Sequence, residues 1–284
     1  MYSNDMARKP PYPFVKWAGG KTKAASLILQ RLPEKINTYY EPMIGGGAIL
    51  IALAKEKRFQ KAVISDTNPE LINAWKVVKG NVEPLILALQ NPKLAYNKQA
   101  FLKVRSENTD AMDSVDRAAR FIYLVRVSFN GLYRVNKEGK FNAPFGRYKD
   151  PIICDIDNLK AMSELLKSVT IYEQGYNATV APAKLGDAVY FDPPYLPISE
   201  TSSFTAYTKE GFSLEDHQKL ASKFKKLGEN GVRVVLTNSV SPETKRLFGK
   251  FDIDYFTGKR SIGGPVEYRK DAQEMVVFHG PKVT

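Results

Sequence analysis

The hydrophobic pattern of this chain has two periods, one typical of strands and one typical of helices. Short apolar runs rich in β-branched or aromatic residues are typical of buried strands. Four such runs cover residues 38–44, 61–65, 187–191 and 232–237. The first run leads into a glycine turn and then an apolar segment, 48–55, that predicts a helix. The chain therefore begins as strand, turn, helix and strand, which favours an α/β fold.

A different pattern interrupts the strands in the middle of the chain. From residue 69 to residue 127, apolar residues recur every three or four positions, which predicts helices. The stretch 129–150 has glycine turns between short aromatic and basic segments, which predicts a β-hairpin or an extended loop. We therefore predict an α/β domain formed by residues 1–68 and 151–284, interrupted at 69–150 by a mostly helical insert that carries the hairpin.

The α/β pattern resumes toward the end of the chain. Ser213, with Asp216 three residues later, has the spacing of a capping box and predicts the start of a helix. The segments 251–255 and 274–278 are alternating and β-rich, and we expect them to form a closing antiparallel pair.

Composition suggests a class of partner for this fold. The 284 residues include 42 Lys and Arg against 30 Asp and Glu, for a net charge of +12. Such an excess suggests a polyanionic partner, although an unrelated basic protein would look the same. One cysteine, Cys154, and two histidines, His217 and His279, offer neither a disulfide nor a zinc cluster, so we expect no metal.

The same composition bears on the compartment. No apolar run approaches the length of a membrane span, and the first eleven residues are polar and proline-rich, unlike a signal peptide. We therefore expect a cytoplasmic protein with a loose N-terminal tail and no membrane association.

The glycine turn is the first candidate for ligand chemistry. Glycines directly after a strand let the backbone approach a ligand closely, and the N-terminus of the next helix favours electron-rich groups. Asp66 ends the following strand, where a carboxylate can accept hydrogen bonds from both hydroxyls of a ribose. This pattern predicts a nucleoside cofactor, and by itself it fits a nicotinamide as well as S-adenosylmethionine.

The segment Asp192-Pro193-Pro194-Tyr195 follows a buried strand directly and is the second candidate. Two prolines stiffen the turn and remove two N–H donors, which leaves a rim rich in acceptors. A carboxylate, a carbonyl and an aromatic face suit an adenine amine, since two acceptors hold its hydrogens and localise its lone pair. The base must leave the duplex to reach such a rim, and the amine itself is the nucleophile. The alternative is a structural proline turn.

Four motifs in this order make the sequence resemble a known family. They are PFVKWAGGK at 13–21, EPMIGGG at 41–47, DPPY at 192–195 and FTAY at 204–207. The chain is similar to the Dam-like (α-group) adenine-N6 DNA methyltransferases, and looks closest to the GATC-specific Dpn-type modification methylases. The likeness runs from about Pro13 to Phe278, and NGLYR at 130–134 and FNAPFGRY at 141–148 extend it into the insert.

The resemblance implies a Rossmann-like S-adenosylmethionine-dependent methyltransferase sheet with an inserted target-recognition domain. It implies that Asp192, Pro193, Pro194 and Tyr195 hold the flipped adenine. The cofactor residues implied by the family are Trp17, Ala18, Gly19, Lys21, Glu41, Gly45, Gly47, Asp66 and Asp192. The DNA-contacting residues implied are Lys16, Arg126, Phe129, Asn130, Leu132, Arg134, Pro144 and Arg147. Double-stranded DNA is the expected partner, and a functional pairing with a restriction endonuclease is possible within this family.

One position departs from the family pattern. Met43 stands where phenylalanine usually follows Glu-Pro. Methionine is a flexible apolar substitute, so the change concerns cofactor packing rather than activity.

Basic residues outside these motifs have two interpretations. Arg117, Arg120 and Arg126, at spacings of three and six, are expected to lie nearly on one helix face and to form a track for phosphates. An ordinary solvated basic face is the alternative. Lys259 and Arg260, in the loop before the last strand, have the same two interpretations.

Other reactions remain as alternatives. A cytosine-N4 enzyme would more often carry serine in place of Asp192, and adenine in RNA would change only the substrate. Cytosine-C5 chemistry needs a cysteine nucleophile, and Cys154 lies outside any strand-end Pro-Cys context. A DNA-binding module that senses S-adenosylmethionine without turnover would not need Asp192 and Tyr195. A nicotinamide oxidoreductase would leave the DPPY segment without a role.

Overall fold

The computed structural model describes residues 9–195, 212–258 and 272–283. Two motif segments from the sequence, FTAY at 204–207 and the pair Lys259 and Arg260, lie outside the described residues. The helices, 3₁₀ turns (η) and strands, in chain order, are α1 (Ala25–Leu29), β1 (Ile36–Pro42), α2 (Ala48–Lys55), β2 (Phe59–Asp66), α3 (Pro69–Gly80), α4 (Val82–Leu89), η2 (Pro92–Leu94), α5 (Lys98–Ser106), α6 (Ser114–Val127), η3 (Phe129–Gly131), α7 (Ile156–Leu166), β3 (Val169–Glu173), α8 (Tyr176–Thr179), β4 (Ala188–Phe191), α9 (Leu214–Glu229), β5 (Arg233–Ser239), α10 (Pro242–Phe248), β6 (Asp252–Gly258) and β7 (Ala272–His279).

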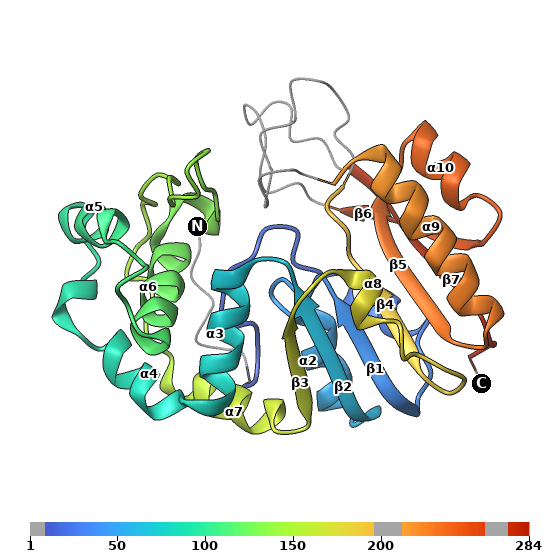
Figure 1. The fold of residues 1–284 in the computed structure, drawn as a ribbon, viewed down its shortest axis with the longest axis horizontal. Helices are drawn as coiled ribbons and strands as arrows, with labels where there is room; N and C mark the ends of the chain where they lie inside the picture. Colours follow the sequence, from blue (N-terminus) through green and yellow to red (C-terminus); the bar gives the residue numbers. More distant parts are fainter. Residues whose placement is uncertain (1–8, 196–211, 259–271, 284) are drawn as a thin grey trace.

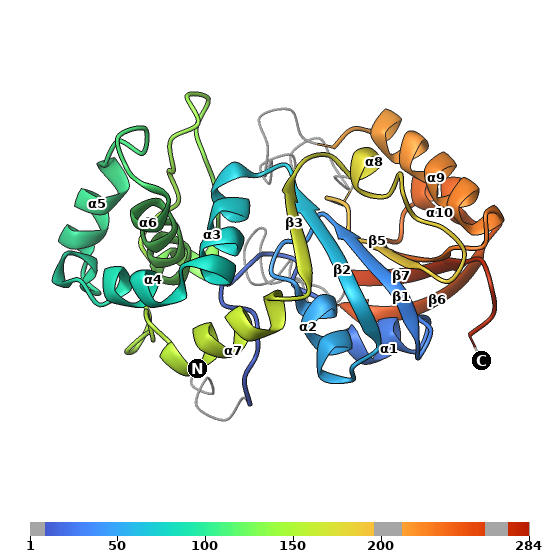
Figure 2. The ribbon, with the colours of Figure 1, turned by 60° about the horizontal axis from the view of Figure 1, so that its bottom comes forward.

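The strands form one seven-stranded sheet in the order β3-β2-β1-β4-β5-β7-β6. All neighbouring pairs are parallel except those made by β7, which is antiparallel to both β5 and β6. Helices α1 and α2 lie on one face of the sheet, and α8, α9 and α10 lie on the other (Figures 1 and 2). The chain order reverses between β1 and β4, which is where open α/β sheets bind ligands.

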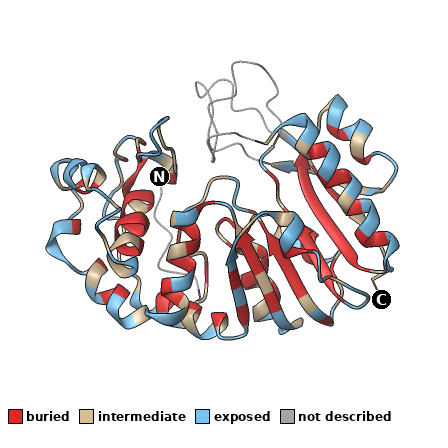
Figure 3. Ribbon diagram, in the orientation of Figure 1, coloured by how far each residue is buried: buried red, intermediate tan, exposed pale blue. Residues whose placement is uncertain are grey.

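The helical insert lies beside the β3 edge of the sheet, with α4, α5 and α6 at one end of the molecule (Figure 1). Helix α3 packs against β2 and β3 on one side and against α6 on the other. The strands and the inner faces of these helices are buried (Figure 3). One hydrophobic cluster therefore runs from the sheet into the insert, and the boundary at residue 69 stays a prediction.

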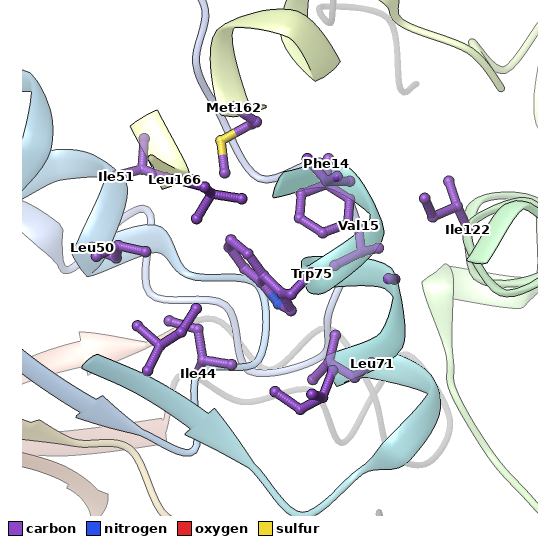
Figure 4. Packing of buried hydrophobic residues seen from close by; sticks show 14 of the residues in the cluster. Phe14, Val15, Ile44, Leu50, Ile51, Leu71, Trp75, Ile122, Met162 and Leu166 are labelled. Atoms are coloured by element: carbon purple, nitrogen blue, oxygen red, sulfur yellow. The ribbon is translucent and has the colours of Figure 1, made fainter. Parts of the chain in front are cut away.

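Trp75 of α3 is the largest fully buried side chain in this shared core. Its ring meets Phe14 of the N-terminal segment edge-on, with centroids 4.8 Å apart, and Ile44 and Leu71 lie close to it (Figure 4). The indole Nε1 donates a hydrogen bond to the carbonyl of Gly45 at 3.1 Å. The insert, the N-terminal segment and the glycine turn are thus packed around one side chain.

Most elements expected from the pattern are confirmed, with one shift. The first strand runs over Ile36–Pro42 rather than 38–44, because Met43 adopts a left-handed backbone conformation with φ of 68° and ends the strand. The capping box at Ser213 is present in full. The closing antiparallel pair is β6 and β7.

The aromatic and basic stretch after α6 is mostly extended loop. Two isolated antiparallel bridges, Ser128 with Phe145 and Val135 with Phe141, give it the outline of a hairpin without continuous strands.

The expected phosphate track on α6 is wrong. Arg120 is buried, and it donates hydrogen bonds to the carbonyls of Val104 and Arg105 at 2.9 and 2.8 Å. Arg117 forms an ion pair with Glu70. Arg126 is half-buried beside Phe14 and Asp155, away from the other two. At roughly 100° per residue, the nine positions between Arg117 and Arg126 place them on opposite helix faces.

No described helix is long and apolar enough to cross a membrane.

Candidate active site

The predicted cofactor and catalytic residues meet at the carboxyl edge of the parallel strands. Strand β1 ends next to Glu41 and leads into the glycine turn, β2 ends at Asp66, and β4 leads into Asp192. Because β1 pairs with both β2 and β4, these three strand ends are neighbours. The edge lies at the point where the strand order reverses, so it is the expected position of a ligand site.

Two positions of the glycine turn leave no room for a side chain. Gly45 and Gly47 have φ angles of 48° and 68°. A Cβ on Gly45 would lie 2.7 Å from Cδ1 of Trp17, and one on Gly47 would lie 2.6 Å from Cη2 of Trp75. The turn therefore runs directly against two indole rings, and any side chain there would displace them.

Asp66 ties the glycine turn to the end of β2. Its carboxylate accepts hydrogen bonds from the backbone N–H of Asn68 at 3.0 Å and of Gly45 at 3.4 Å. Burial raises the pKa of Asp66, and the hydrogen bonds from Asn68 and Gly45 oppose that rise. A half-buried carboxylate beside the turn fits the ribose-binding position expected from the sequence.

Glu41 lies deeper under the same edge. Oε2 accepts hydrogen bonds from the hydroxyl of Tyr39 at 2.8 Å and from the backbone N–H of Leu50 at 2.9 Å. Burial raises the pKa of Glu41 to about 8, although both hydrogen bonds lower it. Near neutral pH this carboxyl is therefore mostly protonated, and it braces β1 against the first turn of α2.

Asp192 has the opposite environment. Nζ of Lys21 lies 2.8 Å from each carboxylate oxygen, and the hydroxyl of Thr237 donates to Oδ1 at 2.9 Å. Lys21 is itself buried and also donates to the carbonyl of Gly19 at 2.7 Å. A buried lysine held against both oxygens fixes the orientation of the Asp192 side chain.

Tyr195 stands beside this ion pair. Its hydroxyl donates to Oε2 of Glu274 on β7 at 2.7 Å, and its ring centre lies 4.9 Å from Nζ of Lys21. Burial is the first cause that raises the pKa of Tyr195 well above its usual value, followed by the charge of Asp192. Pro193 is buried and Pro194 is exposed, so the rim has one inner and one outer proline.

Sequence reasoning missed Thr237 and Glu274. Both come from the β5–β7 pair, and only the strand register brings them to the DPPY segment. Just after β3, the N–H of Gln174 donates to the Asp66 carbonyl at 3.2 Å, so the end of β3 lies beside this edge as well. The order of the strands in the sheet, which places β3 next to β2, predicts this proximity.

The predicted DNA residues gather in two groups. In the first, Lys16 lies against Gly131, where a Cβ would be 2.5 Å from its Cδ, and its Nζ is 3.4 Å from the Tyr148 hydroxyl. Phe129 is exposed, and its N–H donates to the Pro144 carbonyl at 2.8 Å. The N-terminal segment and the hairpin base thus form one surface.

The second group continues along the hairpin. The Nε and Nη2 atoms of Arg134 donate to the side chain and carbonyl of Asn142 at 2.7 and 2.9 Å. Leu132 is half-buried against the core, whereas Arg147 is exposed. Asn130 adopts a left-handed conformation with φ of 55°. No group of three His, Cys, Asp or Glu side chains that could hold a metal occurs among residues 9–195, 212–258 and 272–283.

Comparison with known proteins identifies the family of the chain. Residues 17–262 match the family described as D12 class N6 adenine-specific DNA methyltransferase. The chain belongs to that family. It is 45% identical over 271 residues to the Type II methyltransferase M1.LlaDCHI of Lactococcus lactis subsp. cremoris, covering 93% of this chain and 94% of that protein. It is 31% identical to the DNA adenine methylase of Escherichia coli strain K12, covering 95% and 96%.

This methyltransferase is therefore an adenine-specific DNA enzyme, as the resemblance implied. The alternatives of a cytosine-N4 enzyme, a nicotinamide oxidoreductase and a sensor without turnover are not retained. The sheet with its antiparallel β7 confirms the expected α/β fold class.

The buried Glu41 gives the methyltransferase a specific pH dependence. Its folded-state pKa of about 8 exceeds the value of 4.5 for an exposed glutamate, so the folded state binds more protons between these values. The contribution of Glu41 to stability is complete below the lower value and is lost as pH rises through the upper one. As the pH rises from 4.5 to about 8, the wild type should therefore lose a few kcal/mol of unfolding free energy relative to Glu41→Gln, because one pKa unit is worth about 1.4 kcal/mol.

Urea unfolding without cofactor, at several pH values from acidic to mildly alkaline, measures this difference. The exposed Glu138→Gln is the control and should run parallel to the wild type. Parallel curves for Glu41→Gln as well would mean that Glu41 is ionised in the folded protein.

The Tyr195–Glu274 hydrogen bond should orient the aromatic ring of the DPPY segment. Tyr195→Phe and Glu274→Ala should each lower kcat for methyl transfer by about tenfold, and the double variant should be no worse, because both remove one interaction. Tyr195→Ala should be more damaging because it also removes the ring. Tyr123→Phe, which loses a hydroxyl bond to Ala95 in the insert, is the matched control. Additive losses in the double variant would refute the shared role.

Proposed function

We propose that this methyltransferase transfers a methyl group from S-adenosylmethionine to N6 of a flipped adenine in double-stranded DNA, within GATC. The observation that supports the proposal best is the Lys21–Asp192–Thr237 cluster. It holds a carboxylate acceptor and the Tyr195 ring beside the glycine turn at the switch point of the sheet. An amine acceptor, an aromatic face and a nucleoside site are thus adjacent, as methyl transfer to an adenine amine requires.

The residues at the strand ends fit S-adenosylmethionine. The tight glycine turn gives backbone access, Asp66 offers acceptors for ribose hydroxyls, and Trp17 packs beside Gly45. The segment that carries Trp17 continues with Ala18, Gly19 and Lys21, which we assign to the same cofactor site. We assign the rim at 174–176, next to Asp66, to the same site. The cofactor supplies an electrophilic methyl group on a sulfonium.

The DPPY residues act on the amine of the base. Asp192 and the carbonyl of Pro193 accept its two hydrogen bonds, which localises the nitrogen lone pair. Lys21 and Thr237 hold the Asp192 acceptor aligned before the base arrives, so it does not reorganise during the reaction. Tyr195 stacks on the purine. The base must leave the helix to reach this edge, and Phe129 and Asn130 would occupy or flank the gap.

The insert, residues 69–150, is the target-recognition domain in this proposal. Lys16 would contact the first guanine, and Leu132, Arg134 and Pro144 would read the following positions, with the exposed Arg147 toward the phosphates. Arg126, half-buried beside Phe14 and Asp155, is not assigned to DNA. Arginine is the commonest reader of guanine through O6 and N7. Asn142 supports this role by fixing the plane of the Arg134 guanidinium. The likeness of the whole chain to a Type II methyltransferase further suggests that it pairs with a restriction endonuclease.

Methylation of plasmid DNA tests the proposal directly. The purified protein and S-adenosylmethionine should make the plasmid sensitive to an endonuclease that cuts only adenine-methylated GATC, and resistant to one blocked by that methylation. Tritium incorporation without either change would reject GATC while keeping the activity. No incorporation would reject the proposed reaction.

Asp192→Asn should lower kcat by at least about 100-fold while DNA affinity stays close to that of the wild type. The amide retains the shape, but it loses the charge that draws the amine hydrogens in the transition state. Thr237→Val, which leaves the carboxylate and removes one of its donors, should give a smaller loss. Single-turnover transfer of tritium, together with DNA binding, separates the two effects. Turnover of Asp192→Asn within tenfold of the wild type would remove Asp192 from the chemistry.

Arg134→Ala should relax discrimination at one base pair of GATC. A bidentate guanine contact is worth about 1–3 kcal/mol of discrimination, whereas a phosphate contact affects all sequences alike. Asn142→Ala should reproduce part of the effect, because it frees the guanidinium that it orients. Lys140→Ala, an exposed cation near the hairpin tip, is the control. Duplexes altered at one position each are compared by kcat/KM, and a uniform loss for Arg134→Ala would reduce it to a phosphate contact.

A further inference from the structure

Tyr133 lies between two predicted base-reading residues in the chain, but its side chain packs against Trp17 of the N-terminal segment. Leu132 and Arg134 flank it in the chain, and its ring stacks on Trp17 with centroids 5.5 Å apart and an interplanar angle of 27°. Its hydroxyl group hydrogen-bonds with the side chain of Asn68, and burial raises the pKa of Tyr133 to about 12. Its side chain is thus directed toward the sheet edge, and no DNA role was predicted for it.

Both contacts of Tyr133 belong to the cofactor edge. Trp17 packs on the glycine turn, so close that a Cβ on Gly45 would overlap its ring. Asn68 caps α3 by accepting the N–H of Leu71 at 3.1 Å, and its own N–H donates to Asp66 at 3.0 Å.

These contacts close into a ring. The Asp66 carboxylate also accepts a hydrogen bond from the N–H of Gly45 at 3.4 Å. Gly45 is the residue against which Trp17 packs, so the series of contacts ends where it began. The sequence of contacts is therefore Gly45, Asp66, Asn68, Tyr133, Trp17 and back to Gly45. Tyr133 is the one member of this ring that comes from the hairpin.

We propose that Tyr133 is a positioning residue that couples cofactor binding to DNA binding by fixing the stretch 132–134 against the cofactor edge. The inference rests on the proposed function, in which a nucleoside cofactor contacts Trp17 and Asp66 and in which Leu132 and Arg134 contact bases. A bound cofactor restricts the motion of Trp17 and Asn68, the two residues that Tyr133 contacts. The entropy lost when Leu132 and Arg134 become ordered on DNA is then smaller. By thermodynamic reciprocity, DNA tightens the cofactor by the same factor.

A purely structural role for Tyr133 has a different signature. Phe121 and Phe141 also contact its ring, at 5.6 and 5.8 Å between centroids, and these are ordinary core contacts. Loss of core packing would lower stability and weaken DNA binding equally with and without cofactor. The coupling role predicts instead a change in the ratio of the two affinities.

The test measures the dissociation constant for a GATC duplex with and without saturating S-adenosylhomocysteine, by fluorescence anisotropy. Wild type should bind about tenfold more tightly with the cofactor product present, and Tyr133→Ala should reduce that ratio to within about twofold of one. Tyr133→Phe, which keeps the stack and loses the hydroxyl, should give an intermediate ratio. Asn68→Ser should resemble Tyr133→Phe, since serine preserves the helix cap and the fold.

Phe141→Leu is the matched control, because the Phe141 ring contacts the rings of Tyr133 and Phe101, and Phe101 belongs to the core of the insert. It should keep the wild-type ratio whatever it does to the thermal unfolding midpoint. The inference is overturned if Tyr133→Ala and Asn68→Ser keep the ratio, if Phe141→Leu lowers it equally, or if active wild type shows a ratio of one. Failure of wild type to methylate GATC in the plasmid assay would reject the proposed function instead.

Discussion

The contact between Trp75 and the glycine turn is the constraint on which the arrangement of this enzyme depends. The indole fills the space that a side chain on Gly47 would need, and it donates to the carbonyl of Gly45. Because Trp75 belongs to α3, which follows β2 and packs against α6, the glycine turn and the helices after β2 share one packed junction. A close-packed interior transmits small shifts, so the two regions are held in a defined relation.

Two carboxyl groups near this junction have contrasting environments. Glu41 is buried among neutral donors, and burial raises its pKa to about 8. Asp192 faces a buried lysine at 2.8 Å from both its oxygens. The same kind of side chain therefore braces the fold as a mostly neutral acid at one strand end and forms an ion pair with a buried lysine at another. The difference comes from a single ammonium group, supplied by the N-terminal segment.

Basic residues show how limited net charge is as a guide to an interface. Arg120 donates hydrogen bonds to two backbone carbonyls, and Arg117 forms an ion pair with Glu70, although the sequence predicted that both would bind phosphates. Exposed cations occur on the hairpin, among them Lys137, Lys140 and Arg147, and also on the α/β part of the chain, as at Lys219 and Lys245. Net charge alone therefore does not show which of these surfaces meets DNA.

The sequence by itself determined the family, the α/β class and the residues at the strand ends. Periodicity, the glycine turn and the DPPY segment are local signals, and the helix cap at Ser213 is local too. Periodicity also placed the last two strands as an antiparallel pair.

Only the tertiary structure decided which distant groups meet. The Lys21–Asp192 pair, the Tyr195–Glu274 bond and the contact of Tyr133 with Trp17 each join segments far apart in the chain. Such pairings depend on strand register and on packing between elements, which leave no periodic trace in the sequence. The fate of the arginines on α6 depended likewise on which neighbours surround each helix face, and that is fixed only once the helices pack.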